Sequence, residues 1–434
     1  MSVPNPRFQA GPAGPGGPAR QGDVASAPGA AWIVMAAGVC AALHVGKLAP
    51  AIAVLQRDLG LTLVEAGFLL GMVQGAGMTL GLLVGAWCDG LGARRSLMLG
   101  LLLQAGASAS GAGVSGAGPM LALRAVEGLG FLMVVLPAPG LLRALTPPER
   151  LRGVLGTWGA FMPVAIALAL LAGPLVIESG GWRTWWAGLA AVSAAMALTL
   201  RFTVPAQAAP SSATQAPSAA AAGWADSALR TLARRVAITL RAPGPWFVAL
   251  TFAVYSSQWL AVVGFLPTIV AQTGVGPLLS GFVAAGVAAA NILGNAASGH
   301  LMQRGVPAPV LLATGFSTMA AGAVLGFAPL LDPGSAGRLV ALALFSAVGG
   351  LIPGTLFALA VQVAPDERVV SSTVGWMQQW SAAGQVLGPP AVAWVASAAG
   401  GWERTWLATG ACSLAGLALA AGLAHWQASR RAPR

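Results

Sequence analysis

The chain has 434 residues, of which 56% are hydrophobic and 8% are charged, with a formal net charge of +11 at pH 7. Soluble domains carry roughly 25% charged residues, so this composition excludes an ordinary soluble protein and predicts one that crosses a membrane many times. The basic residues occur as short clusters between apolar runs, so they indicate membrane topology and not nucleic-acid binding.

The first 29 residues are rich in Pro, Gly and Ala and contain no apolar run of the length that a signal peptide needs. We expect residues 1–29 to form a disordered cytoplasmic tail. Beyond them, apolar runs of about 20 residues recur, which is the length that a helix needs to cross a bilayer. The first six predicted spans are 30–55, 64–87, 95–114, 118–142, 152–177 and 184–202.

Residues 203–243 interrupt this pattern with prolines, a Ser/Ala/Gln-rich stretch and several arginines. We interpret them as a cytoplasmic linker with a surface-lying helix near its end. Six more predicted spans follow at 244–270, 278–302, 307–329, 337–362, 370–398 and 403–426. The sequence therefore predicts an N-terminal six-helix half at 30–202, a C-terminal half at 244–427, and a short cytoplasmic tail at 428–434.

The distribution of basic residues predicts the orientation, because short loops rich in Lys and Arg stay in the cytoplasm. If both termini are cytoplasmic, the outer loops contain only Arg57, Arg183, Arg338 and Arg404. The other arginines outside the spans then lie on the cytoplasmic side. We expect a multi-pass protein of a bacterial-type inner (plasma) membrane with both termini in the cytoplasm.

The two halves repeat each other in sequence. Trp158 recurs as Trp376, 218 positions later, and the stretch from Gly181 to Trp185 is echoed from Gly401 onward as Gly-Trp-Glu-Arg-Thr-Trp. A duplicated unit whose copies have the same sidedness predicts an all-α membrane protein of 12 transmembrane helices in two pseudo-symmetric halves.

A short charged loop separates the second and third spans. It contains Asp89, the turn glycine Gly92 and the pair Arg94 and Arg95, which fit a sharp reversal at the membrane surface. The spacing Gly-x3-Asp-x2-Gly-x-Arg-Arg, beginning at Gly85, resembles the signature loop between helices 2 and 3 of the major facilitator superfamily of secondary transporters.

This resemblance implies the major facilitator fold over residues 30–427 and a gating role for the loop. In that fold, Asp89 would dock against the cytoplasmic start of helix 11, near Ser371 and Ser372, and hold the inner gate shut. A helix N-terminus favours a carboxylate, so this docking is physically reasonable.

Charged side chains inside the spans are rare, and each costs at least roughly 2.5–3.5 kcal/mol near a helix centre. His44 and Lys47, the chain's single lysine, are three residues apart in the first span, and Arg124 and Glu127 have the same spacing in the fourth. The predicted depths of Lys47 and Arg124 nearly coincide. We therefore hypothesise a substrate-binding cluster for a small anion, with Glu127 or His44 as the proton-coupling group. The alternative is an internal ion-pair network around Arg124 and Glu127.

The second half contributes neutral polar and aromatic side chains that we expect to close over the substrate, although helix packing would explain them equally well. These candidate substrate-binding residues are Tyr255, Gln258, Trp259, Asn291, Trp376 and Gln379. Pro50 and Pro267 occupy matching places in the first and seventh spans, where we expect them to interrupt the helices.

Segments 46–50, 124–130 and 258–267 resemble the cyanate-permease-like branch of the superfamily. The leading hypothesis is a secondary active transporter that moves a small anion, either cyanate-like or a small organic carboxylate, by alternating access. The alternative is an efflux pump for hydrophobic or nitro-aromatic compounds.

A membrane enzyme or sensor is disfavoured, because the three histidines are dispersed and no ATP-binding loop occurs. We expect a monomer with no metal and no cofactor. Its expected partners are the lipid bilayer, an anionic small molecule and, if transport is proton-coupled, protons.

Overall fold

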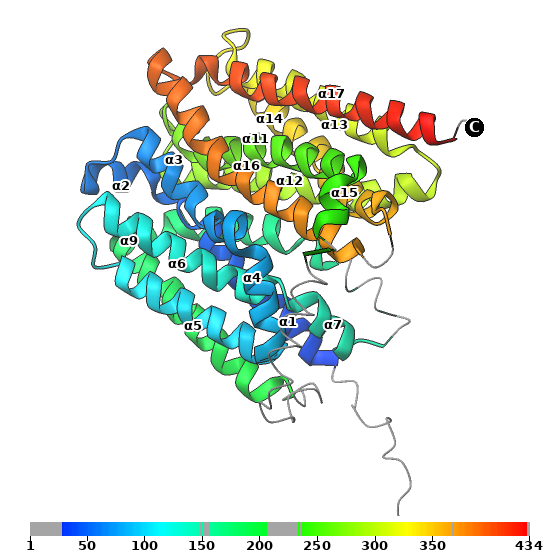
Figure 1. The fold of residues 1–434 in the computed structure, drawn as a ribbon. Helices are drawn as coiled ribbons and strands as arrows, with labels where there is room; N and C mark the ends of the chain where they lie inside the picture. Colours follow the sequence, from blue (N-terminus) through cyan, green and yellow to red (C-terminus); the bar gives the residue numbers. More distant parts are fainter. Residues whose placement is uncertain are drawn as a thin grey trace, which may run out of the picture.

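The computed structural model describes residues 28–147, 150, 154, 157–205, 233–234, 236–366 and 369–431. The regular structure in these residues is entirely helical, as the fold prediction requires (Figure 1). The N-terminal helices are α1 (Pro28–Gly46), η1 (Ala49–Ala51), α2 (Ile52–Leu59), α3 (Leu63–Met72), α4 (Gly75–Leu91), α5 (Ala93–Gly111), α6 (Ala117–Val135), α7 (Ala138–Leu145) and α9 (Phe161–Thr203). The later helices are α11 (Pro243–Ala271), α12 (Pro277–Gln303), α13 (Ala308–Phe327), α14 (Ala336–Gly349), α15 (Leu351–Val363), α16 (Val370–Ala399), η4 (Trp402–Arg404) and α17 (Thr405–Arg431).

Within the described residues, eight helices are long and apolar enough to cross a membrane. A ninth is added if the bent pair Leu63–Met72 and Gly75–Gly81 counts as one span. The 43-residue α9 covers two predicted spans that meet at Gly181, whose φ of 78° is non-helical. The chain is thus a multi-pass integral membrane protein, while the full count of twelve crossings stays a prediction.

Of the two prolines that were predicted to interrupt helices, Pro50 does so and Pro267 does not. Around Pro50 the first span changes from α1 through the 3-10 turn η1 into α2. Pro267, by contrast, lies inside α11, which continues to Ala271, so the predicted interruption there is wrong. A proline removes one backbone hydrogen bond, and the close packing around the buried Pro267 keeps the helix continuous.

The helices before residue 205 pack mainly against one another, as do those after residue 243 (Figure 1). In the first group α1 and α5 both contact α9, and α5 contacts α6. In the second group α11 contacts α16, and α13 contacts α14 and α17. The two groups meet along a seam where α3 and α4 contact α16 and α9 contacts α12.

Glycines make this seam tight. A Cβ atom at Gly71 of α3 would lie 2.5 Å from the carbonyl oxygen of Gln385 in α16. At Gly281 of α12, a Cβ atom would lie 2.6 Å from the carbonyl oxygen of Leu170 in α9. Small residues let backbones approach this closely in membrane proteins. The seam therefore closes at residues that the sequence places toward the outer side.

Several predicted segments fall outside the described residues, namely the tail up to residue 27, linker residues 206–232 and 235, and tail residues 432–434. Within the predicted tail, Pro28 and Gly29 already belong to α1. Within the predicted linker, residues 236–241 are helical and lead directly into α11.

Candidate functional site

One carboxylate receives two cations at the centre of the first helix group. Lys47 forms an ion pair with Oε1 of Glu127, and Arg124 Nη1 lies 2.7 Å from Oε2 of the same side chain. Arg124 and Glu127 are three residues apart on α6, so they share a face of that helix, and Lys47 directly follows the end of α1. All three side chains are at most 1% exposed.

The ammonium group of Lys47 has a full set of acceptors. Besides Glu127, it donates to Ser108 Oγ of α5 at 2.9 Å and to His44 Nδ1 at 3.4 Å. The ring of Trp186 from α9 completes the enclosure, with Nζ 4.6 Å from the ring centroid. A lysine has three hydrogens to donate, so each of them has one acceptor here.

We assign the tautomer of His44 from these contacts. A charged lysine can only donate, so Nδ1 of His44 accepts and its Nε2 carries the hydrogen. Nε2 then donates to Ser193 Oγ of α9 at 2.8 Å. We therefore assign a neutral imidazole to His44, because a charged one would place three cations around a single carboxylate.

Among the described residues, Arg124 forms hydrogen bonds through Nε and Nη1 only. Its Nε donates to the carbonyl oxygen of Leu69 in α3 at 3.1 Å, and Nη1 donates to the carbonyl oxygen of His44 at 2.5 Å as well as to Glu127. Its Nη2 is buried and has no hydrogen-bond partner among the residues that the structure describes. A buried donor without a partner is rare and costly, so Nη2 is a candidate point for ligand binding.

Several neutral residues also contact this cluster, and they were not predicted from the sequence. Ser108 donates to the carbonyl oxygen of Trp186 at 2.9 Å, and Trp185 Nε1 donates to the carbonyl oxygen of Lys47 at 3.0 Å. Gln104 of α5 donates to the carbonyl oxygen of Ala41 at 3.0 Å. Gln104 and Ser108 lie four residues apart in a largely apolar span, and this spacing is the signal that could have revealed them.

In the second group, three of the predicted residues form one hydrogen-bonded set. Asn291 Nδ2 of α12 donates to the hydroxyl of Tyr255 and to the carbonyl oxygen of Ser346, both at 2.9 Å. Trp259 Nε1 donates to Ser346 Oγ of α14 at 3.0 Å. Asn295 donates to Oδ1 of Asn291 at 2.9 Å, so the Asn291 side chain is fully engaged.

Two other predicted substrate-binding residues, Gln258 and Gln379, form hydrogen bonds with other helices. Gln258 accepts a hydrogen bond from Ser413 of α17 at 3.0 Å, so it faces a different helix from Tyr255. Gln379 of α16 donates across the seam to the carbonyl oxygen of Met78 in α4 at 2.8 Å.

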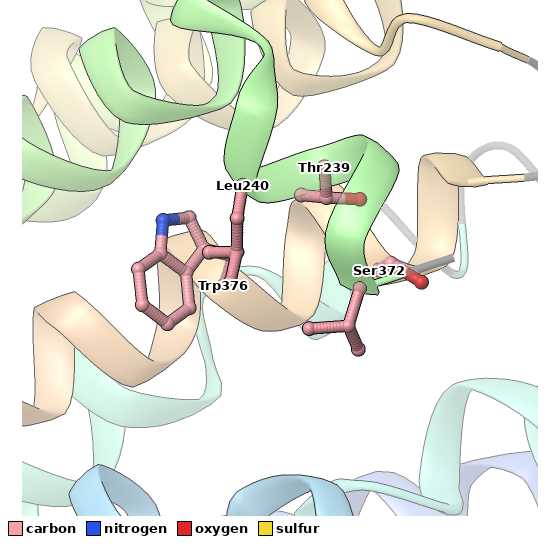
Figure 2. Close-up of a pocket in the computed structure, with 5 residues that line it drawn as sticks. Thr239, Leu240, Ser372 and Trp376 are labelled. Carbon is pink, nitrogen blue, oxygen red and sulfur yellow. The ribbon is translucent and has the colours of Figure 1, made fainter. Parts of the chain in front are cut away.

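Trp376 lies in the first turns of α16, where it packs edge-on against Trp246 at 5.0 Å. Together with Ser372 it faces the helical segment that precedes α11, across a small pocket also lined by Val236, Thr239 and Leu240 (Figure 2). The hydrogen bonds of the described residues do not join Trp376, Gln258 or Gln379 to the Glu127 cluster.

The predicted gating loop is only partly described. Gly92 has a φ of 80° and separates α4 from α5, as a turn glycine should. Arg94 donates to the carbonyl oxygen of Arg201 at the end of α9, and Arg95 is exposed. The side chains of Asp89 and Ser371 lie outside the described residues, so the docking of Asp89 at helix 11 stays a prediction.

Comparison with known proteins identifies the kind of protein to which the chain is similar. A family model described as Major Facilitator Superfamily matches residues 34–382. None of the curated proteins compared with the chain matches it.

Solved transporters share the fold at low sequence identity. A bacterial homolog to the human lysosomal transporter Spinster, in an inward-facing and occupied conformation, is 14% identical with a TM-score of 0.74, covering 94% of this chain and 98% of that one. A D-xylose–proton symporter is 16% identical with a TM-score of 0.69, covering 90% and 96%. The nucleoside transporter NupG is 13% identical with a TM-score of 0.67, covering 90% and 99%.

Proposed function

Because the chain belongs to the major facilitator superfamily, we propose that it is a secondary active transporter that moves a small anion by alternating access. The family consists of transport proteins and not enzymes, and the chain is a membrane transporter with a small-molecule substrate. The anion is either cyanate-like or a small organic carboxylate, in keeping with the resemblance to the cyanate-permease-like branch.

The observation that carries this proposal is the ratio of charges around Glu127. Two buried cations, Lys47 and Arg124, share this one carboxylate, and within the described residues it is the only acidic group paired with either of them. With His44 neutral, the cluster keeps one uncompensated positive charge. A buried charge without a counter-ion is costly, so an anionic ligand would stabilise the site.

We assign the opposite wall of the substrate path to the second helix group. Tyr255, Trp259 and Asn291 supply neutral hydrogen-bonding and aromatic groups in one connected set. We assign them to the uncharged part of the substrate, while Gln258, Gln379 and Trp376 act through helix packing and gating. The two helix groups are the halves 30–202 and 244–427 that move relative to each other.

Proton coupling would act through Glu127, with His44 as the neighbouring relay. If Glu127 takes up a proton, Lys47 and Arg124 both lose their counter-ion, and the cluster attracts an anion more strongly. Release of that proton would return the cluster to its lower charge, so proton transfer at Glu127 would change the affinity for the anion. The transporter would act as a monomer in a bacterial-type inner membrane with cytoplasmic termini.

One observation favours the second candidate, efflux of hydrophobic or nitro-aromatic compounds. The Lys47 ammonium is completely buried, and all of its donors are already satisfied. Under that alternative the cluster only holds α1, α5, α6 and α9 together, and its replacement would lower stability without changing anion uptake.

The deciding experiment measures uptake of labelled cyanate and acetate by vesicles containing the wild type, Lys47→Ala or Arg57→Ala. Arg57 is an exposed cation outside the cluster and serves as the matched control. We expect Lys47→Ala to abolish saturable uptake while the protein still inserts in the membrane, and Arg57→Ala to behave as wild type. Saturable uptake that survives in Lys47→Ala would refute the assignment of Lys47 to the anion site, and a wild type without saturable uptake of either anion would refute anion transport.

A further inference from the structure

We propose that Glu127 sets the valence of the transported anion, so that the site accepts monoanions at Arg124 Nη2 and rejects dianions. This inference rests on the proposed anion transport and assigns the substrate class more narrowly. It follows from the charge of the cluster and from Arg124 Nη2, a cluster nitrogen that has no hydrogen-bond partner among the described residues.

The charge of the cluster is +1. Lys47 and Arg124 contribute two positive charges, Glu127 contributes one negative charge, and His44 is neutral by its hydrogen bonds. The groups that complete the cluster are neutral, namely Ser108, Ser193, Gln104, Trp186 and the carbonyl oxygens of His44 and Leu69.

While Glu127 is ionised, a bound monoanion would make this buried region neutral, whereas a dianion would leave an uncompensated negative charge there. Uncompensated charge at bilayer depth is unfavourable, so valence becomes the basis of selection.

The available donors also limit the ligand. Lys47 has acceptors for all of its hydrogens, so it has none left for a ligand in this arrangement. Arg124 uses Nε and Nη1 for protein acceptors and leaves Nη2 free. The two hydrogens of Nη2 can hold one small acceptor group, such as the carboxylate of a monocarboxylate or the end of a cyanate ion. Lys47 is thus a positioning residue, which acts on the ligand through Glu127 and through charge.

The test varies the cluster charge and compares two ligands that differ by one carboxylate. Butyrate and succinate have four carbons each and carry one and two charges at pH 7.5. Their dissociation constants are measured from the thermal stabilisation of the full-length protein in detergent. We expect the wild type to bind butyrate at least about tenfold more tightly than succinate, because one unit charge a few ångströms away is worth that much or more at an effective dielectric constant of 20.

Three variants then change the charge in steps. Glu127→Gln raises it to +2 and should reverse the preference toward succinate. The double variant Lys47→Met with Glu127→Gln restores +1 and should restore the preference for butyrate. Lys47→Met alone gives a charge of zero and should bind neither anion. Glu178→Gln removes a carboxylate from an exposed position and should keep the wild-type ratio.

The outcomes separate this inference from the proposed function. If no anion stabilises the wild type, the anion-transport proposal fails and this inference fails with it. If the wild type binds anions but a folded Glu127→Gln variant keeps the wild-type ratio, only the valence assignment is overturned. Should Glu127→Gln not fold, Lys47→Met decides, since butyrate binding at wild-type strength by that variant would also overturn the assignment.

Discussion

The ring of Trp186 covers the ammonium group of Lys47, with Nζ 4.6 Å from the ring centroid, and both side chains are fully buried. The aromatic face carries partial negative charge, so this contact stabilises a cation that is removed from water. Trp186 also packs edge-on against Trp182 at 5.5 Å, and Trp182 in turn donates to Asp58 at 2.8 Å. The cation of the site is therefore connected through two tryptophans to an acidic residue of α2.

The first prediction concerns the aromatic cover itself. Replacing Trp186 by Leu removes the ring face, and we expect a loss of about 2 kcal/mol or more of stability from the cation–π contact, in addition to lost packing. Replacing Trp186 by Phe keeps a ring, so it should cost less. Thermal unfolding in detergent measures both, with Trp394→Leu, at a 65% exposed position, as the control. Equal losses in the Leu and Phe variants would show that the ring face contributes nothing.

The second prediction concerns Ser108, which accepts from Lys47 and donates to the carbonyl oxygen of Trp186. Replacing Ser108 by Ala leaves a buried ammonium hydrogen and a buried carbonyl oxygen without these partners. A buried unsatisfied group costs about 1–3 kcal/mol, so the unfolding midpoint of a chain of this length should fall by about 1–3 °C. Ser110→Ala on the same helix, at an exposed position, should leave the midpoint unchanged. A midpoint for Ser108→Ala equal to that of the control would contradict the hydrogen-bond assignment.

The third prediction separates Asn291 from Tyr255. Asn291 bonds to three groups, so Asn291→Leu leaves the Tyr255 hydroxyl, the Ser346 carbonyl oxygen and the Asn295 amide without this partner. Tyr255→Phe removes only one acceptor, and the Asn291 amide still bonds to Ser346. We therefore expect Asn291→Leu to lower the unfolding midpoint clearly more than Tyr255→Phe does. The reverse order of midpoints would mean that Tyr255 has further contacts.

The sequence predicts the fold well, and it predicts that four ionisable side chains of the first half lie together, because both produce strong signals. Long apolar runs indicate membrane helices, and four ionisable residues inside such runs are rare enough to stand out. Their spacing of three predicts a shared helix face, and the structure brings His44, Lys47, Arg124 and Glu127 together.

The remaining contacts depend on helix rotation and on neutral residues, which give weak signals. Tyr255 and Gln258 are also three residues apart, yet one bonds to α12 and the other to α17, because neighbouring helices lie on both sides of α11. Trp186 has no feature in the sequence that separates it from ordinary packing residues, and Ser108 is marked only by its spacing of four from Gln104. That Glu127 accepts from both cations could likewise be found only from the packing of α1 against α6.

The last prediction concerns the seam between the two helix groups. A side chain at Gly71 cannot fit while α3 packs against α16, since even a Cβ atom would lie 2.5 Å from the carbonyl oxygen of Gln385. Overpacking costs about 1–3 kcal/mol, and about 1.4 kcal/mol changes a conformational population tenfold. Gly71→Leu should therefore favour a conformation in which this part of the seam is open.

Spin labels at Arg57 of α2 and Ser397 of α16 would report the change, in a background with the native cysteines replaced by alanine. Both positions are exposed, and the sequence places both on the outer side. We expect longer label-to-label distances in Gly71→Leu than in the wild type. Gly81→Leu is the matched control, because a Cβ atom at Gly81 would have nothing within 4 Å. Identical distance distributions for both variants would mean that the close approach at Gly71 does not hold the seam shut.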